Sequence, residues 1–211
     1  MKPNVRLTAL LLLVSLSTLT VLSGLTATAR AEGEQLPYVE ANEEGMHVQP
    51  WFRSTFLDLT EDMAEAKSEG KQLAIIWEQK GCPYCREMHR VNLRIPDAVD
   101  YIKKHFFVVQ LNLWGDREVV DVDGEQTTEK KLGRKYRVQF TPTIQFFDKE
   151  PNKDPRSVEV WRLMGYWKPF HFKHTFVYVA EDGFKTQPNF QRWLQTRAEE
   201  YQKQGKEVKL W

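Results

Sequence analysis

Apolar residues that recur every three or four positions alternate along the chain with short continuous apolar runs. The recurring pattern is typical of amphipathic helices, and it predicts them at residues 56–72, 86–95, 96–106, 129–138, 168–181 and 189–204. The continuous runs are rich in β-forming residues, and they predict strands at 73–79, 106–114 and 140–149, with 157–166 as the hairpin partner of the last. Asp123-Gly124, between alternating segments, predicts a further hairpin within residues 117–130.

This order of elements predicts an α/β fold. Strands and helices alternate first and a hairpin follows, so we expect a mixed central sheet with helices on both faces. The acidic, irregular composition of residues 32–50 predicts a mobile N-terminal arm. We expect the main domain over residues 51–187 and a C-terminal helical extension over residues 188–211.

The first 31 residues have the regions of a secretory signal peptide. Lys2 and Arg6 precede an apolar stretch from Leu7 to Leu25, and Ala29-Arg30-Ala31 offers small residues where a signal peptidase cleaves. The competing interpretation is an uncleaved membrane anchor, because nineteen residues nearly span a bilayer. The Ser and Thr content and the Ala-x-Ala ending favour cleavage, and hence export to the periplasm.

Charge and length narrow the classes of function. Removal of residues 1–31 leaves 27 basic against 29 acidic residues, a balance that favours neither nucleic acid nor an anionic membrane surface as a partner. The remaining length, about 180 residues, can bury a core without disulfides. The acids Asp121, Asp123 and Glu125 do not have the spacing of a calcium loop, so we expect a solvated hairpin there.

The chain has two cysteines, Cys82 and Cys85, in the stretch GCPYCREMH. A structural staple, a metal site and a redox centre are the three interpretations. A disulfide that closes so short a loop restrains the unfolded chain little, which disfavours the staple. A C-x-x-C pair between a strand and a helix favours the redox centre.

The predicted helix after the strand places Cys82 at a helix N-terminus. Unpaired backbone N–H groups and the helix dipole stabilise a thiolate there, so Cys82 is the expected nucleophile. Cys85 lies one turn further and is the expected resolving thiol. Pro83 suits the first helical turn because its missing N–H would have no partner there.

His89 raises the metal alternative, because it follows Cys85 by four residues on the same helix face. Cys82, Cys85 and His89 would be suitable ligands for zinc or copper in a metal-binding chaperone. A fourth ligand would have to come from His47, His105, His171 or His174, none of which has a fixed spacing to the motif. The other interpretations of His89 are packing beside the redox helix and tuning of the thiols. His171 and His174 are expected to cover a surface helix.

Thr141-Pro142 heads the predicted strand at 140–149, about 57 residues after Cys85. An ordinary strand-start proline is one interpretation. With a redox motif upstream, we favour a cis peptide bond at this position.

These features together resemble the thioredoxin superfamily and, more narrowly, the exported SoxW-type thioredoxins of bacterial sulfur oxidation. The residues that carry the resemblance are IIWEQKGCPYCREMHRVN, VVQLNLWGDREV, FTPTIQFF and WRLMGYWKPFHF. The resemblance implies a thioredoxin-like fold in which Cys82 attacks and Cys85 resolves, and in which Pro142 shapes the substrate groove and Thr141 meets the substrate backbone.

The chain departs from the general thioredoxin pattern near the cysteines. Thioredoxins usually carry Trp before the first cysteine and Gly-Pro between the pair, where this chain has Gly81 and Pro83-Tyr84. The dipeptide between the cysteines tunes the potential. The buried acid of thioredoxins corresponds to Ile76. Glu78 points to the same side of the strand, so it is either a substitute acid or an exposed strand-end residue.

The resemblance implies an exported thiol–disulfide oxidoreductase, most simply a reductase with the redox-active disulfide Cys82–Cys85. Its partners would be a periplasmic protein substrate that bears a disulfide or a cysteine and a membrane thiol–disulfide electron donor. We expect a monomer and no cofactor, metal or nucleic acid. A disulfide oxidase or isomerase is the alternative within the same class.

Overall fold

The computed structural model describes residues 34–148, 158–206 and 208. These residues belong to one folded unit. The predicted signal peptide, residues 1–31, and the last residues of the predicted C-terminal extension lie outside the described residues. No helix among the described residues has both the length and the apolarity that a membrane span requires.

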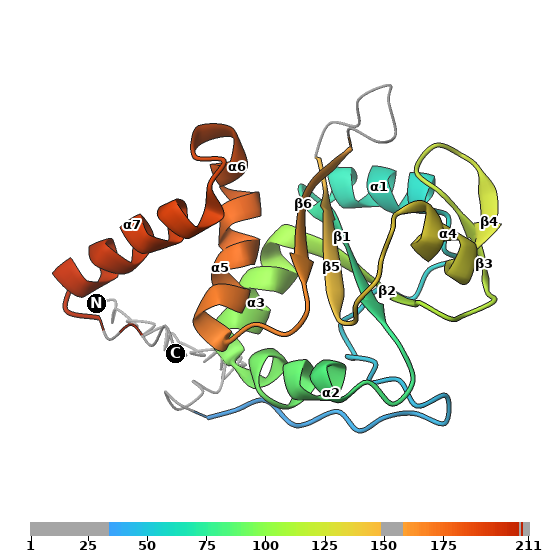
Figure 1. The fold of residues 1–211 in the computed structure, drawn as a ribbon, viewed down its shortest axis with the longest axis horizontal. Coiled ribbons are helices and arrows are strands. Elements are labelled where there is room, and N and C mark those ends of the chain that lie inside the picture. The colour runs from blue at the N-terminus through green and yellow to red at the C-terminus, as the bar shows by residue number, and fades with distance from the viewer. Residues whose placement is uncertain (1–33, 149–157, 207, 209–211) are drawn as a thin grey trace, which may run out of the picture. The chain divides into compact units, whose positions relative to one another are not determined.

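The centre of the fold is a four-stranded mixed sheet (Figure 1). Its strand order is β2 (Phe106–Asn112), β1 (Gln72–Glu78), β5 (Thr143–Phe147) and β6 (Glu159–Met164). β1 pairs in parallel with β2, whereas β5 pairs antiparallel with both β1 and β6. All four strands were predicted from the apolar runs, and the mixed sheet is confirmed.

Helices cover both faces of this sheet, as predicted (Figure 1). One face packs against α2 (Pro83–Arg90), α3 (Pro96–His105), α5 (Pro169–Ala180) and α7 (Phe190–Lys203). The other face packs against α1 (Leu59–Ser68) and α4 (Glu129–Lys135). The short helix α6 (Gly183–Thr186), which the pattern did not predict, lies between α5 and α7 in the chain.

Alternation along β1 explains how one strand serves both cores. Ala74 and Ile76 enter the core beneath α3 and α5, whereas Ile75 and Trp77 enter the core beneath α1 and α4. Every residue of β1 is buried because both faces are covered. The same alternation puts Glu78 on the face of Ile76, toward α2.

The helix predicted at residues 86–95 has a break. α2 ends at Arg90, and a separate 3₁₀ turn, Asn92–Arg94, precedes α3. The Asn92 side chain is buried and donates from Nδ2 to the carbonyl of Trp167 at 2.8 Å. This bond ties the turn to the segment before α5.

The segment before α1 differs from the mobile arm that its composition predicted. Leu36 N donates to the carbonyl of Arg94 at 2.8 Å, and Arg94 Nε donates back to the carbonyl of Leu36 at 2.7 Å. Further along, Gln110 Nε2 donates to the carbonyl of His47 at 2.9 Å, and Met46 is buried. We call residues 34–50 the strap, because they run along α2 and the edge strand β2 (Figure 1).

The predicted acidic hairpin forms from β3 (Glu118–Val120) and β4 (Gln126–Thr128), but it is not fully solvated. Asp121 is completely buried and accepts a hydrogen bond from the Tyr136 hydroxyl at 2.6 Å. Lys135 Nζ lies 2.5 Å from Asp121, 2.7 Å from Asp123 and 2.7 Å from Glu125. The three acids thus surround a lysine of α4, and the positive charge of this lysine partly balances their negative charges.

Candidate active site

Cys82 and Cys85 form a disulfide at the junction of β1 and α2. Cys82 is the N-cap of α2 with extended backbone, and Pro83 occupies the first helical turn, as predicted. Gly81 before them has φ +71°, a conformation that other residues rarely adopt. The tight turn from strand to helix therefore depends on this glycine.

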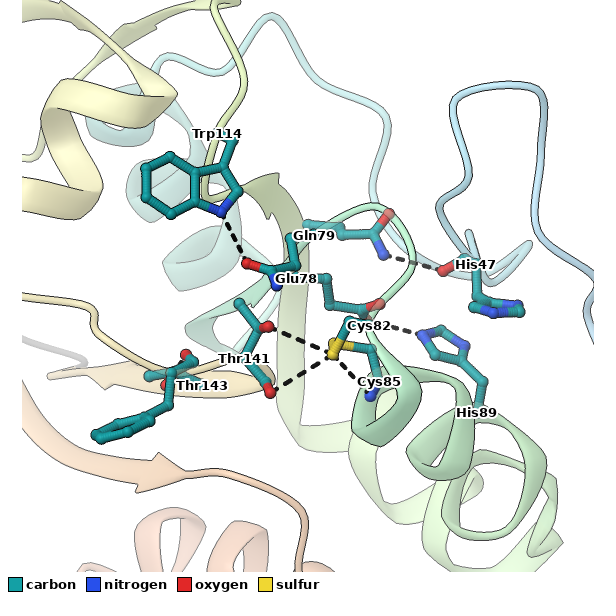
Figure 2. Close-up of a disulfide and its surroundings, with 11 residues drawn as sticks. His47, Glu78, Gln79, Cys82, Cys85, His89, Trp114, Thr141 and Thr143 are labelled. Carbon is teal, nitrogen blue, oxygen red and sulfur yellow. Dashed lines mark hydrogen bonds and ion pairs between the residues drawn. A yellow bond between two sulfur atoms is a disulfide. The ribbon is translucent and has the colours of Figure 1, made fainter.

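The sulfur of Cys82 is surrounded by hydrogen-bond donors (Figure 2). The backbone N–H of Cys85 donates to it at 3.0 Å and the hydroxyl of Thr141 at 3.3 Å, while the carbonyl oxygen of Thr141 lies 3.5 Å away. The peptide bond between Thr141 and Pro142 is cis. On reduction, the same two donors would stabilise a negative charge on Cys82.

The two cysteines differ in access to the surface. Both are buried, Cys85 at 1% and Cys82 at 6% exposure, but only Cys82 contacts Thr141, which faces a surface groove. Beside Cys82 lies a groove lined by Tyr84, Phe140, Thr141, Met164, Gly165 and Tyr166. Tyr84, Phe140 and Met164 are each more than half exposed, so this groove presents an apolar surface. Pro142, which the resemblance placed at the substrate groove, is not among the residues that line it.

Glu78, whose role the sequence left open, is buried behind the disulfide. It is 1% exposed, so the interpretation as an exposed strand-end residue was wrong. Its Oε1 lies 2.8 Å from Nε2 of His89, which is itself completely buried. Figure 2 shows the Glu78 side chain extending toward His89.

His89 has a partner at each ring nitrogen. Nε2 contacts Glu78, and Nδ1 contacts Nε2 of Gln49 at 2.9 Å. The ring also stacks on His47, with centroids 5.2 Å apart. Because both nitrogens are engaged, His89 has no lone pair available for a metal with Cys82 and Cys85, and this geometry does not support the metal-binding chaperone.

Gln49 and His47 are the site residues that sequence reasoning missed. Both lie in the strap and are buried, at 4% and 8% exposure. The apolar residues of the strap do not recur with the period of a helix or strand, and no motif relates its positions to those of the cysteines. The sequence therefore did not indicate that either residue lies at the site. His47 was considered only as a distant metal ligand.

The two tryptophans near the strand ends have different environments. Trp77 is fully buried and donates from Nε1 to Gln145. Trp114 is 59% exposed and donates from Nε1 to Oε1 of Gln79 at 2.8 Å, close to the disulfide (Figure 2). Trp114 is therefore a surface residue at the rim of the site and not part of the core.

Taken together, the geometry suits thiol–disulfide exchange. One sulfur lies beside an open groove among donors that favour its thiolate, and the second is buried within reach of the first. A buried carboxylate and an imidazole lie on the inner side. This arrangement provides a nucleophile, a resolving thiol and a group that could hold a proton.

Solved structures that are similar to this chain include a thioredoxin-fold protein from Helicobacter pylori, with 21% identity over 67% of this chain and 92% of that chain, at a TM-score of 0.49. A thioredoxin from Thermus thermophilus has 24% identity over 58% and 83%, at a TM-score of 0.46. The DsbD C-terminal domain of Neisseria meningitidis has 14% identity over 56% and 89%, at a TM-score of 0.39. A comparison with curated proteins finds no match.

The family model of the thioredoxin-like domain matches residues 59–180, which is more than half of the chain. The matched segment runs from α1 to the end of α5, so it contains the whole central sheet, both cysteines and the cis Thr141–Pro142 bond. The chain therefore belongs to the thioredoxin-like domain family.

Proposed function

We propose that this protein is an exported thiol–disulfide oxidoreductase that reduces disulfides of other periplasmic proteins. The observation that carries the proposal is the asymmetry of the disulfide. The sulfur of Cys82 accepts hydrogen bonds from Cys85 N and from the Thr141 hydroxyl, and Thr141 lines an apolar groove, whereas Cys85 is almost completely buried and does not line the groove. Membership in the thioredoxin-like family supports the same chemistry.

The reaction would begin from the reduced form. The Cys82 thiolate attacks one sulfur of the substrate disulfide, and the other substrate sulfur leaves as a thiolate that takes up a proton. Cys85 then loses its proton and attacks Cys82, which releases the second substrate thiol and leaves the Cys82–Cys85 disulfide. Two electrons pass from the cysteine pair to the substrate.

The groove indicates how a protein substrate would be held. Tyr84, Phe140 and Met164 offer apolar contact area next to Cys82. The Thr141 backbone lies at the same place, so an extended segment with apolar residues beside its cysteine would fit. The resemblance to SoxW-type proteins suggests a sulfur-carrier protein of sulfur oxidation as the substrate and a membrane thiol–disulfide protein as the electron donor.

Trapping of mixed disulfides tests the proposal. The Cys85→Ser variant keeps the nucleophile but cannot resolve, so we expect it to accumulate covalent complexes with its substrates in a periplasmic extract. The Cys82→Ser/Cys85→Ser double variant is the matched control and should trap nothing. If the single variant traps no more than the double variant, the catalytic proposal fails.

The direction of electron flow needs a separate measurement. Equilibration with glutathione buffers of known potential, read by alkylation of the free thiols, gives the reduction potential of the pair. A reductase should have a potential near that of thioredoxin, about −270 mV. A value near the oxidising limit of the fold, about −120 mV, would overturn the reductase assignment and favour the oxidase.

A further inference from the structure

Behind the disulfide, three side chains from three separate segments form a buried hydrogen-bonded chain. Gln49 of the strap contacts His89 of α2, and His89 contacts Glu78 at the end of β1, at distances of 2.9 and 2.8 Å. All three are at least 96% buried. Few arrangements of protons suit a buried polar chain of this kind, because a group left unpaired away from water costs free energy.

The direction of each hydrogen bond follows from the chemistry of the groups. In the structure the amide nitrogen of Gln49, which can only donate, faces Nδ1 of His89, and in this orientation of the amide Nδ1 accepts and carries no proton. The ring proton of neutral His89 is then on Nε2, where it donates to the Glu78 carboxylate. Gln49 therefore fixes which tautomer His89 presents to Glu78.

The chain lies next to the buried thiol. The buried face of α2 consists of Cys85, Met88 and His89, and Cys85 is one turn before His89 on that face. Glu78, bonded to His89, approaches this same face from β1. The Gln49–His89–Glu78 chain and Cys85 consequently share the space between β1 and α2.

We propose that Gln49 is a positioning residue for the resolving step, which extends the proposed function to a residue outside the matched family domain. In this step the Cys85 thiol gives its proton to the Glu78 carboxylate, and the Cys85 sulfur forms its bond to Cys82 while the bond from Cys82 to the substrate sulfur breaks. The departing substrate thiolate takes up a proton. Gln49 holds His89, and His89 holds Glu78 in position to receive the proton of Cys85.

Two further aromatic side chains pack against the ring of His89. His47 of the strap stacks on its ring, and Phe52 meets it edge-on at 6.0 Å between centroids. His47 itself contacts the Val39 carbonyl at 2.9 Å and the Tyr38 hydroxyl at 3.5 Å. The titratable groups around His89 are thus Glu78, Cys85 and His47, with Tyr38 beyond His47.

The test compares Gln49→Met with a matched control, Gln110→Met, in the full protein. Both glutamines hold the strap, but Gln110 donates to the His47 backbone and does not contact His89. Stopped-flow reduction of a small aromatic disulfide separates attack by Cys82 from resolution by Cys85. For Gln49→Met we expect resolution to slow about tenfold and its pH profile to move, with attack unchanged. Gln110→Met should leave resolution within about twofold of the original protein.

Equal slowing in both variants, slowing of attack as much as resolution, or an unmoved pH profile would overturn the proposal. An independent readout needs no folded variant: ¹⁵N shifts of the His89 ring in the unaltered protein should show a proton on Nε2 and none on Nδ1. A proton on Nδ1 would also overturn it. If the proposed role of Gln49 fails these tests, Cys85→Ser can still trap mixed disulfides. The role of Gln49 and the oxidoreductase function are therefore tested separately.

Discussion

At the scale of single residues, the donors around Cys82 form the most direct link between sequence and chemistry. A strand followed at once by a helix leaves N–H groups at the helix start without partners, and one of them, from Cys85, reaches the Cys82 sulfur. The sequence predicted this donor. It also placed Thr141 near the substrate, but it gave no indication that the Thr141 hydroxyl bonds the sulfur, because the two residues are 59 positions apart.

Replacement of Thr141 by valine tests this donor. Thr141→Val keeps the shape and removes the hydroxyl that donates to the Cys82 sulfur. The thiolate should then be less favoured, and we expect alkylation of reduced Cys82 by iodoacetamide near pH 6 to slow about three- to tenfold. Thr141→Ser restores a hydroxyl and should regain most of the rate. Equal rates for all three proteins would show that the hydroxyl does not act on the thiolate.

At the scale of elements, the apolar period located the helices and strands, and burial on both faces of β1 followed from its continuous apolar run. The pattern could not reveal polar groups whose partners lie elsewhere in the chain. Asp121 can be buried because Lys135, the last residue of α4, and Tyr136 just after it both bond to its carboxylate. Asp62 is a second case, since it is 3% exposed in the first turn of α1 and accepts from the Thr55 hydroxyl at 3.1 Å.

Replacement of Asp62 by asparagine should stabilise the protein at neutral pH. Burial is the main cause that raises the pKa of Asp62 to about 6, above its usual 3.8. The folded state therefore loses stability as the pH rises from 3.8 through 6, because over this range the unfolded chain gives up the proton of Asp62 that the folded chain retains. We expect Asp62→Asn to raise the free energy of unfolding at pH 7.5 by about 1–3 kcal/mol and to have little effect near pH 3.5.

Urea denaturation at the two pH values provides this measurement. The neighbouring Glu61 is exposed, so Glu61→Gln is the matched control and should change stability little at either pH. If Asp62→Asn had the same free energy of unfolding as the original protein at pH 7.5, ionisation of Asp62 would not destabilise the folded state.

At the scale of the whole molecule, α5 and α7 pack through aromatic side chains around a buried histidine. His174 was expected on a helix surface, yet it is 2% exposed and packs on Phe170, with ring centroids 4.0 Å apart. Its Nδ1 donates to the Phe170 carbonyl at 2.7 Å, and no residue that the structure describes forms a hydrogen bond with Nε2. The spacing of α5 gave no sign of this, because the residue is covered by Trp193 and Tyr201 of α7, a separate helix.

Acid should weaken this interface. Burial is the main cause that lowers the pKa of His174 to about 4 from its usual 6.5. Its contribution to stability is complete above pH 6.5 and is lost as the pH falls toward 4, because the unfolded chain takes up a proton that the folded chain resists. We expect a loss of about 2–3 kcal/mol over this range from His174 alone.

A pH series of urea denaturation for the original protein and His174→Phe isolates this effect. The phenylalanine keeps the packing and cannot titrate, so the difference between the two proteins should change by about 2–3 kcal/mol between pH 7 and pH 4. A difference that stays constant with pH would mean that His174 takes up a proton as readily in the folded protein as in the unfolded chain.

The strap has a consequence for how this protein can be divided. A fragment cut at the limits of the matched family domain, residues 59–180, would keep both cysteines, Glu78 and His89 but would lack Gln49, His47 and α7. Such a fragment would expose one face of α2 and the apolar faces of β6 and α5 to water. For engineering, the smallest unit with a complete redox site therefore begins near residue 34 and ends after α7, and a fusion partner joined at residue 59 would separate the cysteines from side chains that surround them.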